Sequence, residues 1–248
     1  MIPELESFKL LLKRKEMRIY QLTDNNIFPD PVTAAPDGLL AFGGDLTTTR
    51  LITAYSLGIF PWYSEEQPIL WWSPNPRMVL FPNKFIRHKN LIKTVTSSKF
   101  QISFDSMFEE VIELCSSIPR KGQDGDTWIT EEMKKAYIDL HKIGIAHSVE
   151  VSYNNKIAGG LYGLSIGGCF FGESMFHLVT DASKVALWHL VDRLLIWKFD
   201  LIDVQQETEH LRSMGATSVD RKEFLHLLKN SITKESKTGS WNLPATKN

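Results

Sequence analysis

The sequence has little cysteine, no long apolar run and no excess of charge of either sign. Its two cysteines, Cys115 and Cys169, are too few for a disulfide framework and lack metal-ligand spacing, so we expect reduced core thiols. No run of about 18 apolar residues is present, which excludes a membrane-spanning helix. The N-terminal residues mix charges into a short apolar run, unlike a signal peptide, so we expect the cytoplasm.

Charge and familiar catalytic motifs narrow the class further. Lys and Arg total 28 against 29 Asp and Glu in 248 residues. The net charge of −1 argues against an extended nucleic-acid coat protein but permits a local basic patch. A hydrophobic fraction of 43% is typical of a globular chain. The sequence contains no H-E-x-x-H, no G-x-S-x-G, no P-loop and no His/Cys cluster, so we expect no metal site.

The composition changes at about residue 80. Residues 20–82 are rich in proline, glycine and aromatics, which predicts short strands and loops around one helix over 46–57. Residues beyond about 231 are polar. We therefore expect a small N-terminal α/β domain over 1–80, a larger catalytic domain over 81–235 and a disordered tail over 236–248.

The larger domain shows the order β, α, α, β, β, β, α, β, α. Alternating apolar residues and the turns at 154–155 and 167–168 predict three successive antiparallel strands. A helix over 181–199, with Asp181 as its cap, permits strand 201–205 to pair in parallel with strand 169–176. This α+β mixed sheet resembles that of the GNAT-type N-acyltransferases, which join an acyl donor to an amine.

A basic strip and an aromatic cluster lie next to each other in the sequence. No acidic residue occurs between Glu66 and Asp105, although the interval holds six Lys and Arg residues. The strip is either a solvated helix face or a binding surface for a short stretch of phosphates. The tryptophans and other aromatics upstream either pack in the core or stack on unpaired bases.

Two polar groups interrupt apolar strands. Glu173 follows a glycine within an apolar strand, where an isolated carboxylate is costly, so it either forms a salt bridge or binds a substrate amine. Asp203 and Gln205 are two apart on a strand, which predicts that both point to one face. Such a pair either lies on the surface or orients an amine. Residues 174–184 contain no glycine, so the pyrophosphate of coenzyme A has no obvious seat there.

Seven motifs occur in a fixed order along the chain. They are FPWY at 60–63, LWWSPNPR at 70–77, DTWIT at 126–130, HSVE at 147–150, GESMF at 172–176, ASK at 182–184 and LIDVQ at 201–205. Together they resemble the bacterial leucyl/phenylalanyl-tRNA–protein transferase family over about residues 19–228, with the first sixteen residues as an extension.

The resemblance implies a small N-terminal domain followed by a GNAT-like domain. It implies transfer of Leu or Phe, and Met more weakly, from aminoacyl-tRNA to the N-terminal Arg or Lys of acceptor proteins. The acceptor is thereby marked for degradation by the N-end rule. The partners would be aminoacyl-tRNA and these proteins, with neither coenzyme A nor any other cofactor, no metal and no membrane.

The resemblance also assigns residues. Trp62 and Trp128 match the tryptophans that hold the terminal adenosine of the tRNA. The apolar amino-acid pocket would be formed by Leu161, Phe170, Gly172, Glu173, Leu187 and Ile202. Leu161 and Leu190 depart from a methionine and a phenylalanine of other members. Val204 replaces a cysteine, and we expect it to face away from the site.

A mechanism follows from the chemistry of an activated ester. We expect Asp203 and Gln205 to be catalytic. The side-chain oxygen of Gln205 would accept the amine N–H during attack, while Asp203 would orient Gln205 and favour the developing ammonium. The tRNA backbone would lie on a strip formed by Arg77, Lys84, Arg87, Lys89 and Lys93. Two alternatives stay open: a coenzyme A-dependent GNAT N-acetyltransferase, which would fit the fold, and a non-catalytic tRNA-binding protein, which would fit the strip.

Overall fold

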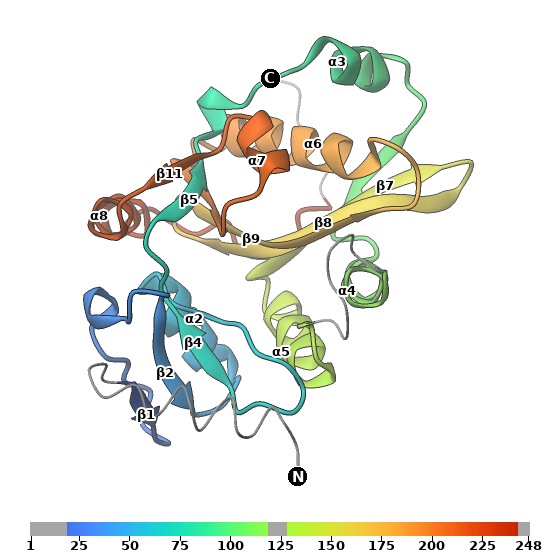
Figure 1. Ribbon diagram of the computed structural model, residues 1–248. Coiled ribbons are helices and arrows are strands. Elements are labelled where there is room, and N and C mark those ends of the chain that lie inside the picture. Colours follow the sequence, from blue (N-terminus) through green and yellow to red (C-terminus); the bar gives the residue numbers. More distant parts are fainter. Residues whose placement is uncertain (1–18, 119–127, 243–248) are drawn as a thin grey trace.

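The computed structural model describes residues 19–118 and 128–242, and in them the chain forms two β-sheets. The smaller sheet has the strand order β1-β2-β4-β3. Its strands are β1 (Tyr20–Leu22), β2 (Leu39–Gly43), β3 (Phe60–Pro61) and β4 (Leu70–Trp72), and helix α2 (Thr48–Ser56) packs beside them. Figure 1 shows this part below the larger sheet.

The larger sheet contains seven strands in the order β11-β5-β10-β9-β8-β7-β6. They are β5 (Arg77–Leu80), β6 (Gln101–Phe104), β7 (Ala146–Tyr153), β8 (Lys156–Ile166), β9 (Cys169–His177), β10 (Leu201–Gln205) and β11 (Thr217–Val219). Strands β7, β8 and β9 are antiparallel neighbours, and β10 pairs in parallel with β9, both as predicted. Strand β5 pairs with β10, so the segment after the small sheet continues into the large one.

Helices cover both faces of the large sheet. Helix α6 (Ala182–Ile196) lies on one face, and α4 (Phe108–Ser117) and α5 (Glu131–Lys142) lie on the other (Figure 1). The remaining helical segments are η1 (Pro31–Thr33), η2 (Pro82–Lys84), α3 (Lys89–Thr96), α7 (Glu209–Ser213) and α8 (Arg221–Ser231). This arrangement confirms the mixed α+β class and the predicted element order, to which the structure adds β5, β11 and a second helix after β10. Among the described residues, no helix is long and apolar enough to cross a membrane.

Local sequence signals explain most element boundaries. Asn154 and Asn155 both have positive φ, as a two-residue hairpin turn requires. Thr47 and Thr130 accept the backbone N–H three residues on and thereby cap α2 and α5. The prediction that Asp181 caps α6 is wrong. Asp181 stands at the N-cap position with a φ of 69°, but its side chain forms no capping hydrogen bond and pairs with Lys184.

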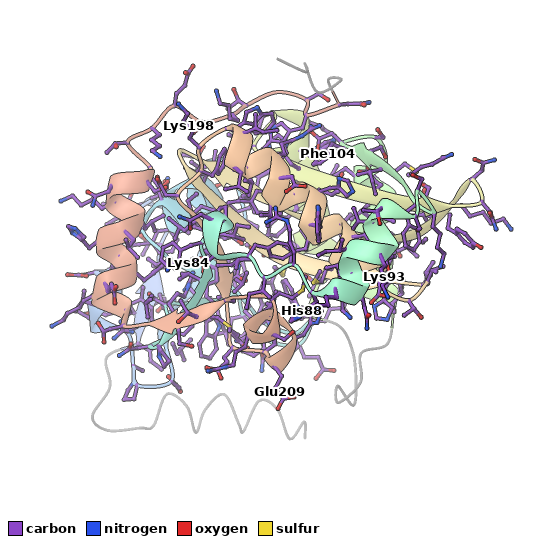
Figure 2. The ribbon with its side chains drawn as sticks, turned by 90° about the horizontal axis from the view of Figure 1, so that it is seen from above. Lys84, His88, Lys93, Phe104, Lys198 and Glu209 are labelled. Atoms are coloured by element: carbon purple, nitrogen blue, oxygen red, sulfur yellow. The ribbon has the colours of Figure 1, made fainter. Side chains whose placement is uncertain are left out.

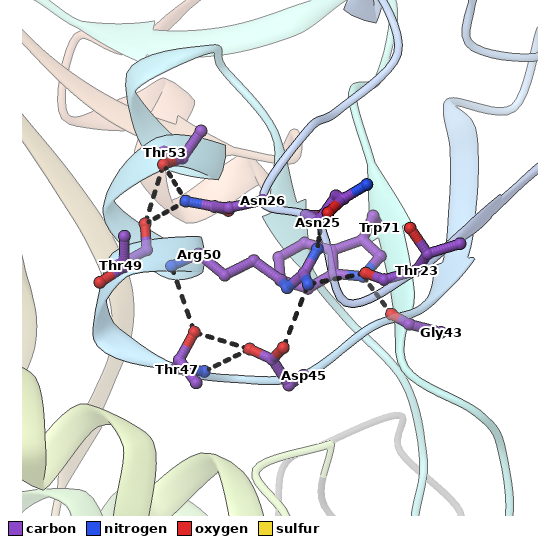
Figure 3. A network of polar contacts seen from close by, with 10 residues as sticks. All are labelled: Thr23, Asn25, Asn26, Gly43, Asp45, Thr47, Thr49, Arg50, Thr53 and Trp71. Carbon is purple, nitrogen blue, oxygen red and sulfur yellow. Dashed lines mark hydrogen bonds and ion pairs between the residues drawn. The ribbon is translucent and has the colours of Figure 1, made fainter.

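A buried arginine fastens the first described residues to α2 (Figure 3). The Arg50 side chain donates to the carbonyl oxygens of Thr23 and Asn25 and pairs with Asp45. Burial alone would raise the pKa of Asp45, but hydrogen bonds from Arg50 and Thr47 outweigh it and lower the pKa to about 2. This network adds to the burial of Leu22 in holding the N-terminal strand and the residues after it against the fold.

The C-terminal segment differs from the expected disordered tail. Trp241 is only 3% exposed and packs in the core on the α6 side of the sheet. The expectation is therefore wrong for residues 236–242, because one large aromatic ring gives an otherwise polar segment enough apolar area to bury. Residues 243–248 lie outside the described residues, as do residues 1–18, which include the expected extension.

Candidate active site

A pocket of about 470 Å³ lies where β8, β9, β10, α6 and α7 meet the small sheet. Its walls include every residue expected to form the amino-acid pocket and both expected adenosine-binding tryptophans. From the sequence predictions the lining contains Trp62, Trp128, Leu161, Phe170, Gly172, Glu173, Leu187, Leu190, Ile202, Val204 and Gln205. Such a volume suits a small ligand, and the lining is mostly apolar.

A bulge at the end of β10 shapes one wall. The register with β5 shifts between Asp203 and Gln205, and Gln205 has a φ of 57°. Ile202 and Val204 line the pocket by regular alternation, and the bulge turns Gln205 into it as well, whereas Asp203 stays behind. The expectations that Asp203 and Gln205 point to one face and that Val204 faces away from the site are therefore wrong.

Asp203 lies behind the pocket and does not line it. Its carboxylate is wholly buried and forms a two-point ion pair with Arg77, with Nε–Oδ1 at 2.8 Å and Nη2–Oδ2 at 2.6 Å. Oδ1 also accepts the backbone N–H of Gln205 at 3.0 Å. Asp203 thus fixes the backbone of the bulge, whereas the side-chain amide of Gln205 bonds to Glu173. The expected catalytic role of Asp203 is therefore corrected to a positioning role.

Arg77 is not part of a tRNA-facing strip. Its side chain is wholly buried, and the guanidinium lies 4.7 Å from the ring centroid of Phe60 and 4.6 Å from that of Phe224. A cation between two aromatic faces and against a carboxylate is neutralised within the fold. The sequence prediction for Arg77 is therefore wrong, since the basic interval includes one residue of the core.

Glu173 and Gln205 form the polar corner of the pocket. The Gln205 amide nitrogen donates to Glu173 Oε1 at 2.8 Å, and the Tyr137 hydroxyl donates to Oε2 at 2.9 Å. Tyr55 continues the chain through its hydrogen bond to Tyr137. Burial raises the pKa of Glu173 to about 7, although the hydrogen bonds from these tyrosines and from Gln205 oppose the shift.

This corner orients the Gln205 amide. The amide nitrogen of Gln205 faces Glu173, which matches a carboxylate that in its ionised form only accepts hydrogen bonds. The amide oxygen then points away from Glu173 and is available to an N–H donor in the pocket. Glu173 forms no salt bridge among the described residues, so the salt-bridge alternative is not observed.

The two tryptophans lie at the side of the pocket that adjoins the small sheet. Trp62 is held from behind, because its carbonyl oxygen accepts the indole N–H of Trp72 at 2.7 Å and the two rings meet edge to face. Trp62 and Trp128 are both partly exposed, so they can still contact a ligand. The first two residues of the DTWIT motif fall within 119–127, which lies outside the described residues.

The other basic residues of the predicted strip are exposed along η2, α3 and the segment between them. Lys84, Arg87, Lys89 and Lys93 all lie on the surface, and Figure 2 labels Lys84 and Lys93 along this path. Arg87 is partly engaged by Asp192 and by the ring of Trp188.

The strip is joined to the pocket by hydrogen bonds. The backbone N–H of Ile86 donates to the carbonyl oxygen of Met214 at 3.0 Å, and His88 contacts that of Ser213. These carbonyls end α7, whose residues His210 and Leu211 line the pocket. The basic surface and the pocket are therefore neighbours.

Sequence reasoning missed the two tyrosines of the polar corner. Tyr55 and Tyr137 each lie on the buried face of an amphipathic helix, a pattern that predicts only core packing. Their polar role depends on contacts 82 and 36 residues away in sequence. No group of three or more His, Cys, Asp or Glu side chains among the described residues could hold a metal ion.

Known proteins resemble this chain along most of its length. The sequence profile of the family described as leucyl/phenylalanyl-tRNA protein transferase matches residues 79–229, and that of its N-terminal domain matches 44–75. A leucyl/phenylalanyl-tRNA–protein transferase of Thermodesulfovibrio yellowstonii is 53% identical over 225 residues, covering 91% of each chain. That of Syntrophotalea carbinolica is 53% identical over 215 residues, covering 87% of this chain and 93% of its own.

Solved structures align with this chain at much lower identity. An aminoglycoside acetyltransferase from a soil metagenome aligns with 48% of this chain and 88% of its own, at 12% identity and a TM-score of 0.36. A GCN5-related N-acetyltransferase from Kribbella flavida aligns with 67% of this chain and 58% of its own, at 8% identity and a TM-score of 0.36.

The sequence matches, together with the mixed sheet and its pocket, define an enzyme of the acyltransferase class. About half of the residues are identical to those of the curated relatives, over about nine-tenths of the chain. The chain belongs to the leucyl/phenylalanyl-tRNA–protein transferase family, as the motifs of the sequence suggest.

Proposed function

We propose that this enzyme moves a leucyl or phenylalanyl group, and a methionyl group less well, from aminoacyl-tRNA to the N-terminal Arg or Lys of acceptor proteins. The modified proteins then enter degradation by the N-end rule. Because aminoacyl-tRNA is made in the cytoplasm, we place the reaction there. The observation that carries the proposal is one pocket that joins an apolar wall, two tryptophans and the Glu173–Gln205 corner.

The apolar wall suits the side chain of the donor amino acid. Leu161, Leu187 and Ile202 contribute aliphatic surface, and Phe170 an aromatic one. An apolar pocket separates side chains that differ by one methylene by only about 1–3 kcal/mol, so Leu, Phe and Met would all enter. We propose that the terminal adenosine lies against Trp62 and Trp128, because aromatic rings stack on unpaired bases.

The exposed strip next to α7 fits the phosphates of the tRNA acceptor arm. Lys84, Lys89 and Lys93 extend from the hydrogen-bonded edge of the pocket, so one nucleic-acid strand could follow them from its terminal nucleotide. The strip is short, which matches a limited number of phosphate contacts.

The reaction needs positioning more than acid–base power. The neutral α-amine of the acceptor attacks the ester carbonyl, the bond to the ribose oxygen breaks, and the amine proton passes to that oxygen. The reference pKa of such an amine is about 7.7–8.0, so a useful fraction is neutral at pH 7. Holding ester and amine in attack geometry can supply about 7–11 kcal/mol. The Gln205 oxygen would accept one N–H of the amine and so align its lone pair.

Coenzyme A fits this structure less well. The start of α6 would have to receive its pyrophosphate, but the N-cap residue there is the acidic Asp181, whose side chain offers no donor to phosphate. The preceding residues 178–181 contain no glycine that would let a phosphate approach the backbone.

The acceptor's basic side chain requires an acidic surface near the pocket. Glu207 and Glu209 follow β10 and are exposed. Glu207 is already engaged by Arg212 and Ser218, so of the two we assign Glu209 the larger share in reading Arg or Lys.

A transfer assay tests the proposal directly. Purified protein is mixed with radiolabelled Leu-tRNA and a protein that begins with Arg, without coenzyme A, and an otherwise identical protein that begins with Ala is the control. The proposal expects label on the first protein only. Tight tRNA binding without transfer would favour the binding protein, and transfer that requires acetyl-coenzyme A would favour the acetyltransferase.

A further inference from the structure

Phe170 forms the aromatic part of the pocket wall, and its ring cannot move toward strand β8. Phe170 lies on β9, which runs between β8 and β10. Its side chain is buried in the fold and forms part of the pocket lining. Its ring lies over Gly163 of β8, where an added Cβ would lie 2.6 Å from ring atom Cε1. The backbone of β8 therefore stops the ring from sinking in that direction.

The C-terminal segment 236–242 is tied across the end of the sheet by backbone contacts. The N–H of Gly167 donates to the hydroxyl of Ser236 at 2.8 Å, and the N–H of Gly239 donates to the carbonyl of Gly144 at 3.2 Å. The N–H of Trp241 donates to a carboxylate oxygen of Asp105 at 2.6 Å. These hydrogen bonds fix the position of the Trp241 backbone relative to the sheet.

The Trp241 ring is also fixed in orientation. It stacks on His147 with centroids 3.8 Å apart and meets Trp197 edge to face at 4.9 Å. Its indole N–H donates to the carbonyl of Lys237 at 3.0 Å. The ring can therefore neither slide nor turn without breaking several contacts.

This fixed ring touches the pocket wall from behind. The ring centroids of Trp241 and Phe170 are 5.9 Å apart with an interplanar angle of 39°. Phe170 is thus confined between Trp241, the backbone at Gly163 and the pocket itself. Because protein interiors are close-packed, a change of volume behind one ring moves its position in front.

We propose that Trp241 is a specificity-determining positioning residue: through Phe170 it sets the depth of the amino-acid pocket and so the preference among donor side chains. The inference rests on the proposed function and assigns to the C-terminal segment a part in it. A smaller residue at 241 lets Phe170 retreat, and the deeper pocket gains more for a phenylalanyl group than for a leucyl group.

The test compares donors within one variant. Specificity constants for Phe-tRNA and Leu-tRNA are measured with wild type, Trp241→Leu and the milder Trp241→Phe, and thermal unfolding is recorded for each. Phe199→Leu is the matched control, because Phe199 is buried and its ring centroid lies 6.5 Å from that of Trp241, yet its ring packs against Trp197 and Trp241 rather than against Phe170.

The proposal expects the Phe-to-Leu ratio to rise about tenfold in Trp241→Leu, the low end of what one methylene of pocket space supplies. Trp241→Phe should move the ratio in the same direction by less, and Phe199→Leu should leave it unchanged. An unchanged ratio in Trp241→Phe and in any folded Trp241→Leu, or an equal change in Phe199→Leu, would overturn the proposal. A wild-type protein that uses neither donor would instead overturn the proposed function.

Discussion

Replacing Arg77 by methionine should remove much of this protein's stability margin. Its partner Asp203 is wholly buried, and both nitrogen–oxygen contacts of the pair are 2.8 Å or shorter. Removing one member of a buried pair leaves an uncompensated charge and costs about 3–5 kcal/mol. Loss of the two aromatic contacts of the guanidinium adds about 1 kcal/mol. Since whole domains are stable by about 5–15 kcal/mol, the variant should be marginal.

The assay is denaturant unfolding at pH 7, with the double variant Arg77→Met/Asp203→Asn as the control. The asparagine that replaces Asp203 in the double variant would carry no charge and keep an oxygen for the backbone N–H of Gln205, so at least half of the lost stability should return. A loss below about 1 kcal/mol in the single variant would refute the reasoning, given the burial of the pair. A double variant no more stable than the single one would also refute it, because the stranded charge would then not be the cause.

Three further predictions follow from the pocket and the strip. The raised pKa of Glu173 means that the folded state binds its proton more tightly than the unfolded state, so stability falls as pH rises from about 4.5 to about 7. Glu173→Gln should remove this pH-dependent loss of stability, which amounts to at most about 3 kcal/mol. The measurement is the difference in unfolding free energy between pH 5 and pH 8, which should be smaller in the variant. An unchanged difference would contradict the raised pKa of Glu173. Gly163→Ala places a Cβ 2.1 Å from a backbone oxygen of β9 and should lower the free energy of unfolding by at least about 1–3 kcal/mol. Gly172→Ala, whose Cβ would have no atom nearer than 3.7 Å, should lower it little. Thermal unfolding compares the two variants, and equal losses would argue against the geometry. Lys84→Glu should weaken aminoacyl-tRNA binding and reduce the slope of log affinity against log salt by about 0.7–0.9, while Lys198→Glu should change neither; equal effects would show that the strip has no special role.

Patterns within one element could be predicted from the sequence. The threonine caps of α2 and α5, the paired asparagines of the β7–β8 turn and the helical crossover into β10 depend on residues close together in the chain. The residues of the amino-acid pocket also lie together, but they were assigned by resemblance to a family. Their positions alone would have marked them only as core.

Features that depend on distant partners could not be predicted. Arg77 belongs to a basic interval in the sequence, and only its pairing with Asp203 across 126 residues removes it from the surface. The expectation that Asp203 and Gln205 share one face rests on regular alternation, which the positive φ of Gln205 interrupts. A non-glycine residue rarely adopts this conformation, so no local signal announces the bulge.

The C-terminal segment shows how composition can mislead. Averaged over residues 236–248, the sequence is polar, which is typical of a frayed end. Trp241 reverses this result, because its ring is buried and the residue forms three hydrogen bonds, while Ser236 forms another with Gly167. A large aromatic residue in a polar segment therefore indicates that the segment packs against the fold.

The central claim is that Gln205 helps the acceptor amine to attack rather than holding the tRNA. Single-turnover transfer of leucine from Leu-tRNA to an acceptor that begins with Arg tests it, with tRNA affinity measured in parallel. The neighbouring Gln206→Ala is the control, since Gln206 also borders the pocket. The account predicts that Gln205→Ala slows transfer about 100-fold with affinity unchanged. Equal losses of rate and affinity, or an unchanged rate, would contradict it.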